Sequence, residues 1–216
     1  MTPEVTVRLT AALLISYTLG SIPFAFLVGK LKGVDIRKVG SGNVGATNLV
    51  RVAGPLPGLA AFTGDFFKGF LAAFLLPRLL QPDWGSGTPW FGLSCGLAAV
   101  AGHSWPIFLR FRGGKGVATS AGMLAAVVPW GLVGGLLTWL ILVILTRYVS
   151  IASMGAAVVA AATCWVVYPT YGYLFPAVLT ALALLVIVKH RSNIRRLFRG
   201  QESRIRFGAR KKSNAE

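Results

Sequence analysis

Long apolar runs without charge constrain the fold of this chain more than any other feature. One of them, residues 117–146, contains no charged side chain. About 20 apolar residues in a helix suffice to cross the hydrocarbon core of a bilayer. Charged residues make up only 13% of the 216 residues, against about 25% in a typical soluble domain, and apolar residues make up 55%. The pattern predicts an all-α integral membrane protein with a single polytopic domain.

We expect seven transmembrane helices. Residues 117–146 fit either one long tilted helix or two short helices broken at Pro129-Trp130-Gly131. Two helices return Arg147 to the cytoplasmic side, as the positive-inside rule requires, so we favour the break. The N-terminus then lies outside and the C-terminus is cytoplasmic. The approximate spans are 7–28, 54–76, 90–109, 117–129, 131–146, 151–168 and 173–188, followed by a loosely ordered basic tail at 201–216.

The charge of the chain is strongly basic, with a formal net charge of +16. Most Lys and Arg residues follow directly after apolar runs, which is typical of membrane proteins, so we do not expect a nucleic-acid partner. Two cysteines, Cys95 and Cys164, lie within apolar runs and have no metal-ligand spacing. We therefore expect two buried thiols, and neither a metal site nor a cofactor.

This topology places four polar segments, residues 40–51, 110–120, 147–153 and 189–202, on the cytoplasmic face. In the first segment, glycines allow backbone N–H groups to turn inward around an anion, and a helix N-terminus near Gly45 adds positive potential. Thr47 and Arg51 then share a helix face. A flexible glycine loop with a helix cap is the alternative. The candidate ligands are Ser41, Gly42, Asn43, Thr47, Asn48 and Arg51.

The second segment carries Gly113-Gly114-Lys115-Gly116 before an expected helix. Backbone donors and a lysine at this place suit an anion. The segment is not a P-loop, because Leu109 stands where that motif requires its first glycine. A basic loop that merely obeys the positive-inside rule explains the charge but not the three glycines.

The other two segments carry hydroxyl, imidazole and amide groups near the ends of apolar runs. Ser150 and Ser153 share a helix face, where they either join neighbouring helices or bind a ligand. His190 and Asn193 share a face if the last helix continues.

Asp65 and Lys68 lie three residues apart inside the second apolar run. Charges inside a membrane are costly, so they indicate either a mutual ion pair that braces the helix or a direct role.

The sequence lacks the residues that several other chemistries require. Six acidic residues are too few for a paired-carboxylate or two-metal site, and neither histidine begins an H-x-x-x-x-D pattern, because Phe108 and Arg195 occupy the acidic positions. The segments together resemble, in order and spacing, the bacterial acyl-phosphate:glycerol-3-phosphate acyltransferase family. The motifs that carry the resemblance are Ser41–Asn48 with Arg51, Gly102-His103 with Gly113–Thr119, Ser150 with Ser153, and Lys189-His190 with Asn193–Leu197 and Gly200-Gln201-Glu202.

The resemblance implies an enzyme of the bacterial inner membrane that transfers a fatty acyl group from acyl phosphate to the 1-hydroxyl of glycerol 3-phosphate. It implies no metal or cofactor, and a functional link to the enzyme that supplies acyl phosphate. Ser41, Asn43 and Thr47 are expected to hold the donor phosphate. Glycerol 3-phosphate is expected to bind Arg51, Lys115, Ser153 and His190, with Asn193 orienting the hydroxyl or the carbonyl.

Two points stay open from the sequence. The base is either His190 or a substrate phosphate. A transporter of phosphate esters is the alternative function, because buried charges and glycine-broken helices also suit one. A basic membrane anchor is a third reading, which explains the tail but not the glycine motifs.

Overall fold

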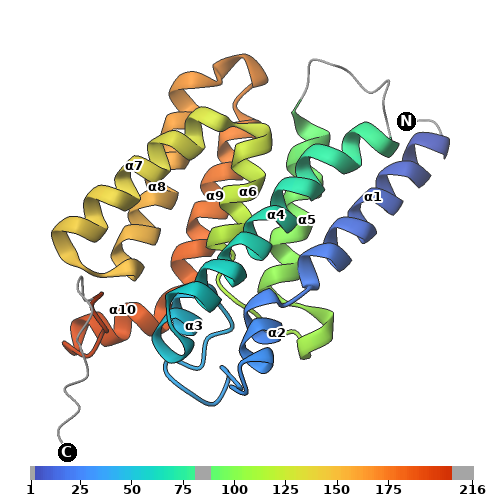
Figure 1. Cartoon of the computed structure of the whole chain (residues 1–216). Helices are drawn as coiled ribbons and strands as arrows, with labels where there is room; N and C mark the ends of the chain where they lie inside the picture. Colours follow the sequence, from blue (N-terminus) through green and yellow to red (C-terminus); the bar gives the residue numbers. More distant parts are fainter. Residues whose placement is uncertain (1–2, 81–88, 206–216) are drawn as a thin grey trace, which may run out of the picture.

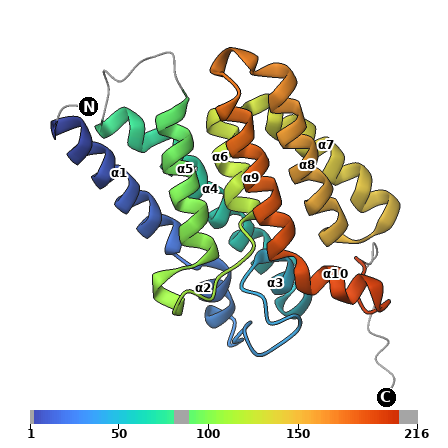
Figure 2. The same cartoon turned by 180° about the vertical axis from the view of Figure 1, so that it is seen from behind.

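A computed structural model describes residues 3–80 and 89–205, and the helices of these parts form one bundle (Figures 1 and 2). No strand occurs within these two ranges. The long helices are α1 Pro3–Ser21, α4 Pro55–Leu80, α5 Trp90–Ser104, α7 Pro129–Thr146, α8 Val149–Val167 and α9 Leu174–Lys189. The short helices are α2 Phe24–Leu31, α3 Ala46–Ala53, α6 Val117–Val127 and α10 Arg191–Phe198, with 3-10 turns at Ile107–Leu109 and Pro169–Tyr171.

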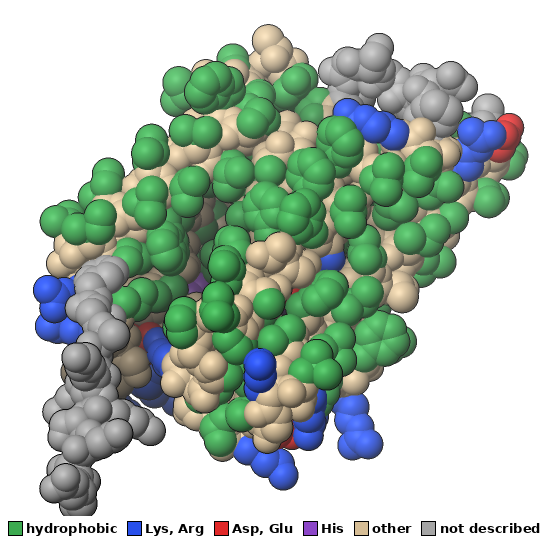
Figure 3. Space-filling view, viewed as in Figure 1, with side chains coloured by type: hydrophobic (Ala, Val, Ile, Leu, Met, Phe, Trp, Pro, Cys, Tyr) green, Lys and Arg blue, Asp and Glu red, His purple; other side chains and the backbone are tan. Residues whose placement is uncertain are grey.

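Within the described ranges, five helical stretches are long and apolar enough to cross a bilayer. A sixth is obtained if α9 and α10, which meet at a bend of 53°, count together. Helix α6 is apolar but shorter. The chain is therefore a multi-helix integral membrane protein, as its composition predicts. Its outer surface is apolar: exposed Leu136, Leu140 and Ile144 on α7 form part of this surface (Figure 3).

The expected break in residues 117–146 is confirmed. Helix α6 ends at Val127, Val128 has an extended φ of −141°, and Pro129 opens α7. A proline disfavours helical geometry in the residue before it and fits the first helical position, so the break lies at Val128, one residue earlier than expected.

The expected first span at 7–28 lies within Pro3–Leu31, which counts as one candidate span but contains a helix break that the sequence did not predict. Helix α1 ends at Ser21 and α2 begins at Phe24, because Pro23 lacks the N–H that would continue the ladder. A residue of another helix stabilises the backbone at this break: Lys68 Nζ of α4 donates a hydrogen bond to the carbonyl oxygen of Ile22, at 2.8 Å. Backbone groups inside a membrane protein need such partners, since lipid offers none.

Small residues bring α4 and α6 into backbone contact. A Cβ on Gly69 would overlap the carbonyl oxygen of Thr119, and one on Gly122 would overlap that of Phe66. Such close crossings are typical of membrane helices, where packing rather than the hydrophobic effect joins the helices. The crossing fixes the start of α6, and with it the Gly113–Gly116 loop, against α4.

Helices α2, α3 and α10 lie together at one end of the bundle, and α1 begins at the opposite end (Figure 1). The loop 110–116 reaches the same end as α3 (Figure 2). We call this end, formed by residues 24–53, 105–116, 147–150 and 189–205, the site end.

Candidate active site

The first polar segment forms a glycine loop that leads into α3. Gly40 and Gly42 have φ values of 62° and 69°, and a Cβ on Gly40 would overlap Asn48 Oδ1. Asn48 is 1% exposed and braces this loop: its Oδ1 accepts the N–H of Ser41 at 2.8 Å, and its Nδ2 donates to the carbonyl oxygens of Ile36 and Val39 at 2.9 and 3.2 Å. The amide of Asn48 thus shapes the loop, while Ser41, Asn43, Thr47 and Arg51 line a cavity beside it.

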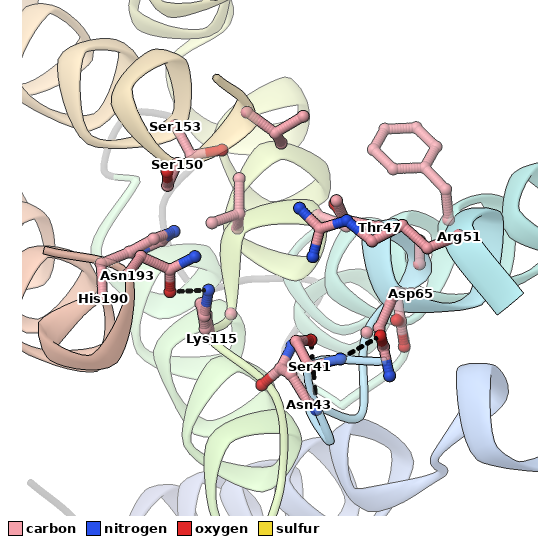
Figure 4. Close-up of a pocket in the computed structure, with 18 of the residues that line it drawn as sticks. Ser41, Asn43, Thr47, Arg51, Asp65, Lys115, Ser150, Ser153, His190 and Asn193 are labelled. Atoms are coloured by element: carbon pink, nitrogen blue, oxygen red, sulfur yellow. Dashed lines mark hydrogen bonds between the residues drawn. The ribbon is translucent and has the colours of Figure 1, made fainter. Parts of the chain in front are cut away.

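The second polar segment passes over His103 of α5. The N–H of Gly114 donates to the carbonyl oxygen of His103 at 3.1 Å, and a Cβ on Gly114 would overlap the His103 ring. Glycine is therefore required at this close approach. The loop directs the next residue, Lys115, toward α10, where Lys115 Nζ donates a hydrogen bond to Asn193 Oδ1 (Figure 4).

The two serines of the third segment are buried at the start of α8. Ser150 is 3% exposed and its hydroxyl donates to Glu202 Oε1 at 3.0 Å. Ser153 is 4% exposed, and its Oγ accepts a hydrogen bond from Trp139 Nε1 at 3.3 Å.

His190 occupies the bend between α9 and α10. Its Nδ1 lies 2.7 Å from the carbonyl oxygen of Val186, so Nδ1 carries the proton and donates. Burial, together with the nearby charge of Lys115, lowers the pKa of His190 to about 4. The imidazole is therefore neutral at pH 7 and has an unprotonated Nε2.

Glu202 belongs to a motif of the resemblance but was not among the predicted ligands; it lines the cavity, and its burial corrects the expected loose order of residues just after Gly200. The carboxylate is 7% exposed and accepts hydrogen bonds from Asn193 Nδ2 and Arg196 Nε, each at 2.7 Å. Although burial raises it, the pKa of Glu202 lies below its ordinary value because Asn193, Arg196 and Ser150 donate to the carboxylate. The available signal was an acidic residue in a strongly basic segment. Residues 206–216 of the predicted tail lie outside the described residues.

These segments surround one polar cavity of about 140 Å³ at the site end (Figure 4). Of the proposed site residues, Gly42, Gly113 and Gly114 do not lie on its wall; they shape the two loops. Phe62, Asp65, His103, Trp139 and Glu202 line the cavity although they were not proposed as ligands. The proposed residues on the wall are Ser41, Asn43, Thr47, Asn48, Arg51, Lys115, Gly116, Ser150, Ser153, His190 and Asn193.

The cavity wall carries two cations, Arg51 and Lys115, beside neutral donors, while its two carboxylates, Asp65 and Glu202, pair with Lys68 and Arg196. Arg51 is exposed at its rim, and Lys115 is half-buried. Burial, followed by the charges of Arg196 and Arg51, lowers the pKa of Lys115 to about 8, although Glu202 opposes the shift. Lys115 therefore remains mostly protonated at pH 7. Hydroxyl and amide groups beside the two cations suit the oxygen atoms of an anion.

Asp65 and Lys68 form the ion pair that the sequence offered as one alternative. Asp65 Oδ1 lies 2.8 Å from Lys68 Nζ and 3.3 Å from His103 Nδ1. Asp65 and Lys68 are each 2% exposed, and His103 is 7% exposed. The buried cluster connects α4, α5 and the α1–α2 break beneath the Gly113–Gly116 loop, so it supports the floor of the site. Cys95 and Cys164 are free buried thiols, as expected.

Fold and cavity together define an integral membrane enzyme with a cationic site at one end of its helix bundle. The chain belongs to the glycerol-3-phosphate acyltransferase family, whose model matches residues 10–200. The glycerol-3-phosphate acyltransferase of Laribacter hongkongensis is 43% identical over 94% of this chain and 98% of its own. That of Aquifex aeolicus is also 43% identical, over 88% of this chain and 95% of its own.

Two solved structures share the fold. A crystal structure of PlsY (YgiH), an integral membrane glycerol 3-phosphate acyltransferase in its glycerol 3-phosphate form, is 40% identical, with a TM-score of 0.82 over 92% of this chain and 96% of its own. The lysphosphatidic acid form of PlsY is also 40% identical, with a TM-score of 0.79 over 92% of this chain and 95% of its own.

Proposed function

We propose that the protein transfers a fatty acyl group from acyl phosphate to the 1-hydroxyl of glycerol 3-phosphate. The hydroxyl oxygen bonds to the acyl carbon, the bond from that carbon to the phosphate oxygen breaks, and the hydroxyl proton leaves to a base. The products are lysophosphatidic acid and inorganic phosphate. The two related crystal structures, named for glycerol 3-phosphate and lysphosphatidic acid, support this acceptor and this product.

One observation carries the proposal: the polar cavity adjoins an apolar cavity. The apolar cavity has a volume of about 180 Å³ and lies among α4, α6, α7, α8 and α9. A hollow is visible between α4 and α7, with a histidine at its inner end (Figure 3). A polar compartment joined to an apolar one fits a reactant with an anionic head and a hydrocarbon tail. The two cavities share Phe62, Val117, Trp139 and Ser153 on their walls.

The donor is assigned by the chemistry that the site offers. Acyl phosphate already carries a good leaving group, so an enzyme for it needs orientation and charge neutralisation rather than a protein nucleophile. We assign Ser41, Asn43, Thr47 and the glycine-loop backbone to the donor phosphate. The use of acyl phosphate implies a functional link to the enzyme that makes it.

The acceptor is assigned to Arg51, which shares α3 with Thr47, and to groups across the cavity from this helix (Figure 4). Arg51, Lys115, Ser153 and His190 hold glycerol 3-phosphate, and Asn193 orients the reacting groups between Lys115 and Glu202. The neutral Nε2 of His190 is available as a proton acceptor. A pKa of about 4 makes it a weak base at pH 7, so a substrate phosphate competes for that role.

We propose seven spans in the inner membrane of a bacterium, with the N-terminus outside and the site end cytoplasmic. Helices α6 and α7 then count as two spans and α1 with α2 as one. The proposal is supported by basic residues at the site end, including Lys30, Arg112, Arg147 and Arg195.

The function is tested with purified protein given palmitoyl phosphate and glycerol 3-phosphate. We expect lysophosphatidic acid and phosphate in equal amounts, and no product when palmitoyl-CoA replaces palmitoyl phosphate. Uptake of glycerol 3-phosphate into vesicles without any product would indicate a transporter instead.

A further inference from the structure

A second, smaller cavity lies behind the apolar cavity, deeper among α6, α8 and α9. Its volume is about 40 Å³. Four residues line this inner cavity and not the outer apolar cavity, namely Ala161, Leu179, Leu182 and Ala183. The two cavities are neighbours, because they share Ser120, Leu124, Ala157, Ala160 and Val186.

Helix α8 leads from the polar site to this inner cavity in successive turns. Ser153 lies at the site, Ala157 and Ala160 line both apolar cavities, and Ala161 lines only the inner one. At 1.5 Å per residue, Ser153 and Ala161 are separated by about 12 Å along the helix axis. Helix α9 also leads from the polar site to the inner cavity, because His190 lines the site and Val186 and Leu182 line the cavity.

The alanines on this wall leave space that larger side chains would fill. Where α8 faces α7, small residues bring the backbones together: a Cβ on Gly135 would lie 3.1 Å from the carbonyl oxygen of Ala156. Where α8 faces α9, Ala157, Ala160 and Ala161 instead border the inner cavity. A cavity inside a protein lowers its free energy of unfolding. An apolar cavity excludes water but binds hydrocarbon groups favourably.

We propose that the inner cavity receives the methyl end of a long acyl chain, and that Ala161 and Ala183 at its wall limit the chain length that the enzyme accepts. The inference rests on the proposed function, since it extends the path of the acyl chain from the polar site. A long chain buries its last methylene groups among α6, α8 and α9, while a short chain ends in the outer cavity. The residues on the wall of the inner cavity therefore affect the binding of long donors and not of short ones.

The test compares kcat/KM for palmitoyl phosphate with kcat/KM for decanoyl phosphate on the same preparation, because this ratio does not depend on how much protein is folded. Ala161→Leu fills the inner cavity, and we expect it to lower the ratio by about tenfold, since burial of each methylene contributes several-fold in affinity. Ala162→Leu is the matched control, because Ala162 is exposed on the next position of α8. It is expected to leave the ratio unchanged.

Leu179→Ala enlarges the cavity and is expected to raise the ratio for stearoyl over palmitoyl phosphate. An unchanged palmitoyl-to-decanoyl ratio in Ala161→Leu, or an equal change in Ala162→Leu, overturns the inference while the acyltransferase assignment stands. Wild-type protein that forms no lysophosphatidic acid from any acyl phosphate would instead disprove the proposed function.

Discussion

Lys115 and Asn193 lie 78 residues apart in the sequence and are joined by a hydrogen bond from Lys115 Nζ to Asn193 Oδ1. The same amide donates through Nδ2 to Glu202 Oε1 at 2.7 Å. Asn193 therefore bridges the main cation of the cavity and its buried carboxylate. This bridge fixes the loop before α6 against α10.

Lys115→Ala is expected to raise the KM for glycerol 3-phosphate by roughly tenfold or more, because a hydrogen bond to a charged partner contributes about 1.5–3 kcal/mol. Steady-state kinetics with saturating acyl phosphate measure the change. Lys38→Ala is the control, since Lys38 is exposed and not among the residues on the cavity wall. An unchanged KM would remove Lys115 from the acceptor site.

Activity is expected to fall as pH rises from 7 to 9. The pKa of Lys115 is about 8, so the lysine loses its proton in this window and with it the charge that attracts a phosphate. The alkaline limb is expected in kcat/KM for glycerol 3-phosphate, which reports the free enzyme. Lys115→Arg keeps its charge at these pH values and is expected to lack this limb. The same limb in that variant would assign it to another group.

Glu202→Gln is expected to reduce activity by about tenfold, and Glu202→Ala by more. The glutamine retains an acceptor for Asn193 but loses the charge that pairs with Arg196, and a lost partner of a buried group costs about 1–3 kcal/mol.

Because the folded-state pKa of Glu202 is lowered, its stabilising effect is present above its unfolded pKa of about 4.5 and is lost as pH falls below it. Thermal unfolding from pH 5 down to pH 3 is therefore expected to show a smaller loss of stability in Glu202→Gln than in the wild type. Equal losses would contradict this role.

Asp65→Asn is expected to destabilise the protein strongly, by about 3–5 kcal/mol, because it leaves Lys68 buried without its counter-charge. Asp65→Asn combined with Lys68→Met removes both charges and is expected to recover much of the loss. Thermal unfolding in detergent compares the three proteins. A double variant less stable than the single one would show that the hydrogen bond from Lys68 to Ile22 matters more than the ion pair.

The proposed seven spans predict opposite exposures for residues 130 and 148. With the two native cysteines replaced by serine, a single cysteine at Trp130 is expected to react with an impermeant thiol reagent added outside intact cells. A cysteine at Tyr148 is expected to react only after the membrane is opened. Labelling of both from the same side would show that α6 and α7 do not form two spans.

The sequence predicted most of the polar residues that line the cavity, because these residues lie in short segments. Ser41, Lys115, Ser150 and His190 were recognised from residue type and spacing, and all line one cavity. Asn48 was predicted as a ligand too, but its buried amide forms hydrogen bonds with the loop backbone. A motif alone does not show whether a side chain is buried. Glu202 stands in one of the motifs but was not predicted as a ligand, because its contacts with Ser150 and Asn193 arise only when the chain turns back after α10.

The sequence alone determined the long apolar helices and the two breaks at prolines, because hydropathy and proline act on the chain locally. Pro129 placed the break between α6 and α7, and Pro23 contained the information for the break after α1 although the apolar run concealed it. Tertiary structure alone decided which polar groups meet. The α4–α6 crossing at Gly69 and Gly122 fixes where Lys115 lies, and the bend at His190 turns Asn193 toward it. Such contacts depend on the packing of helices distant in sequence, which no local pattern specifies.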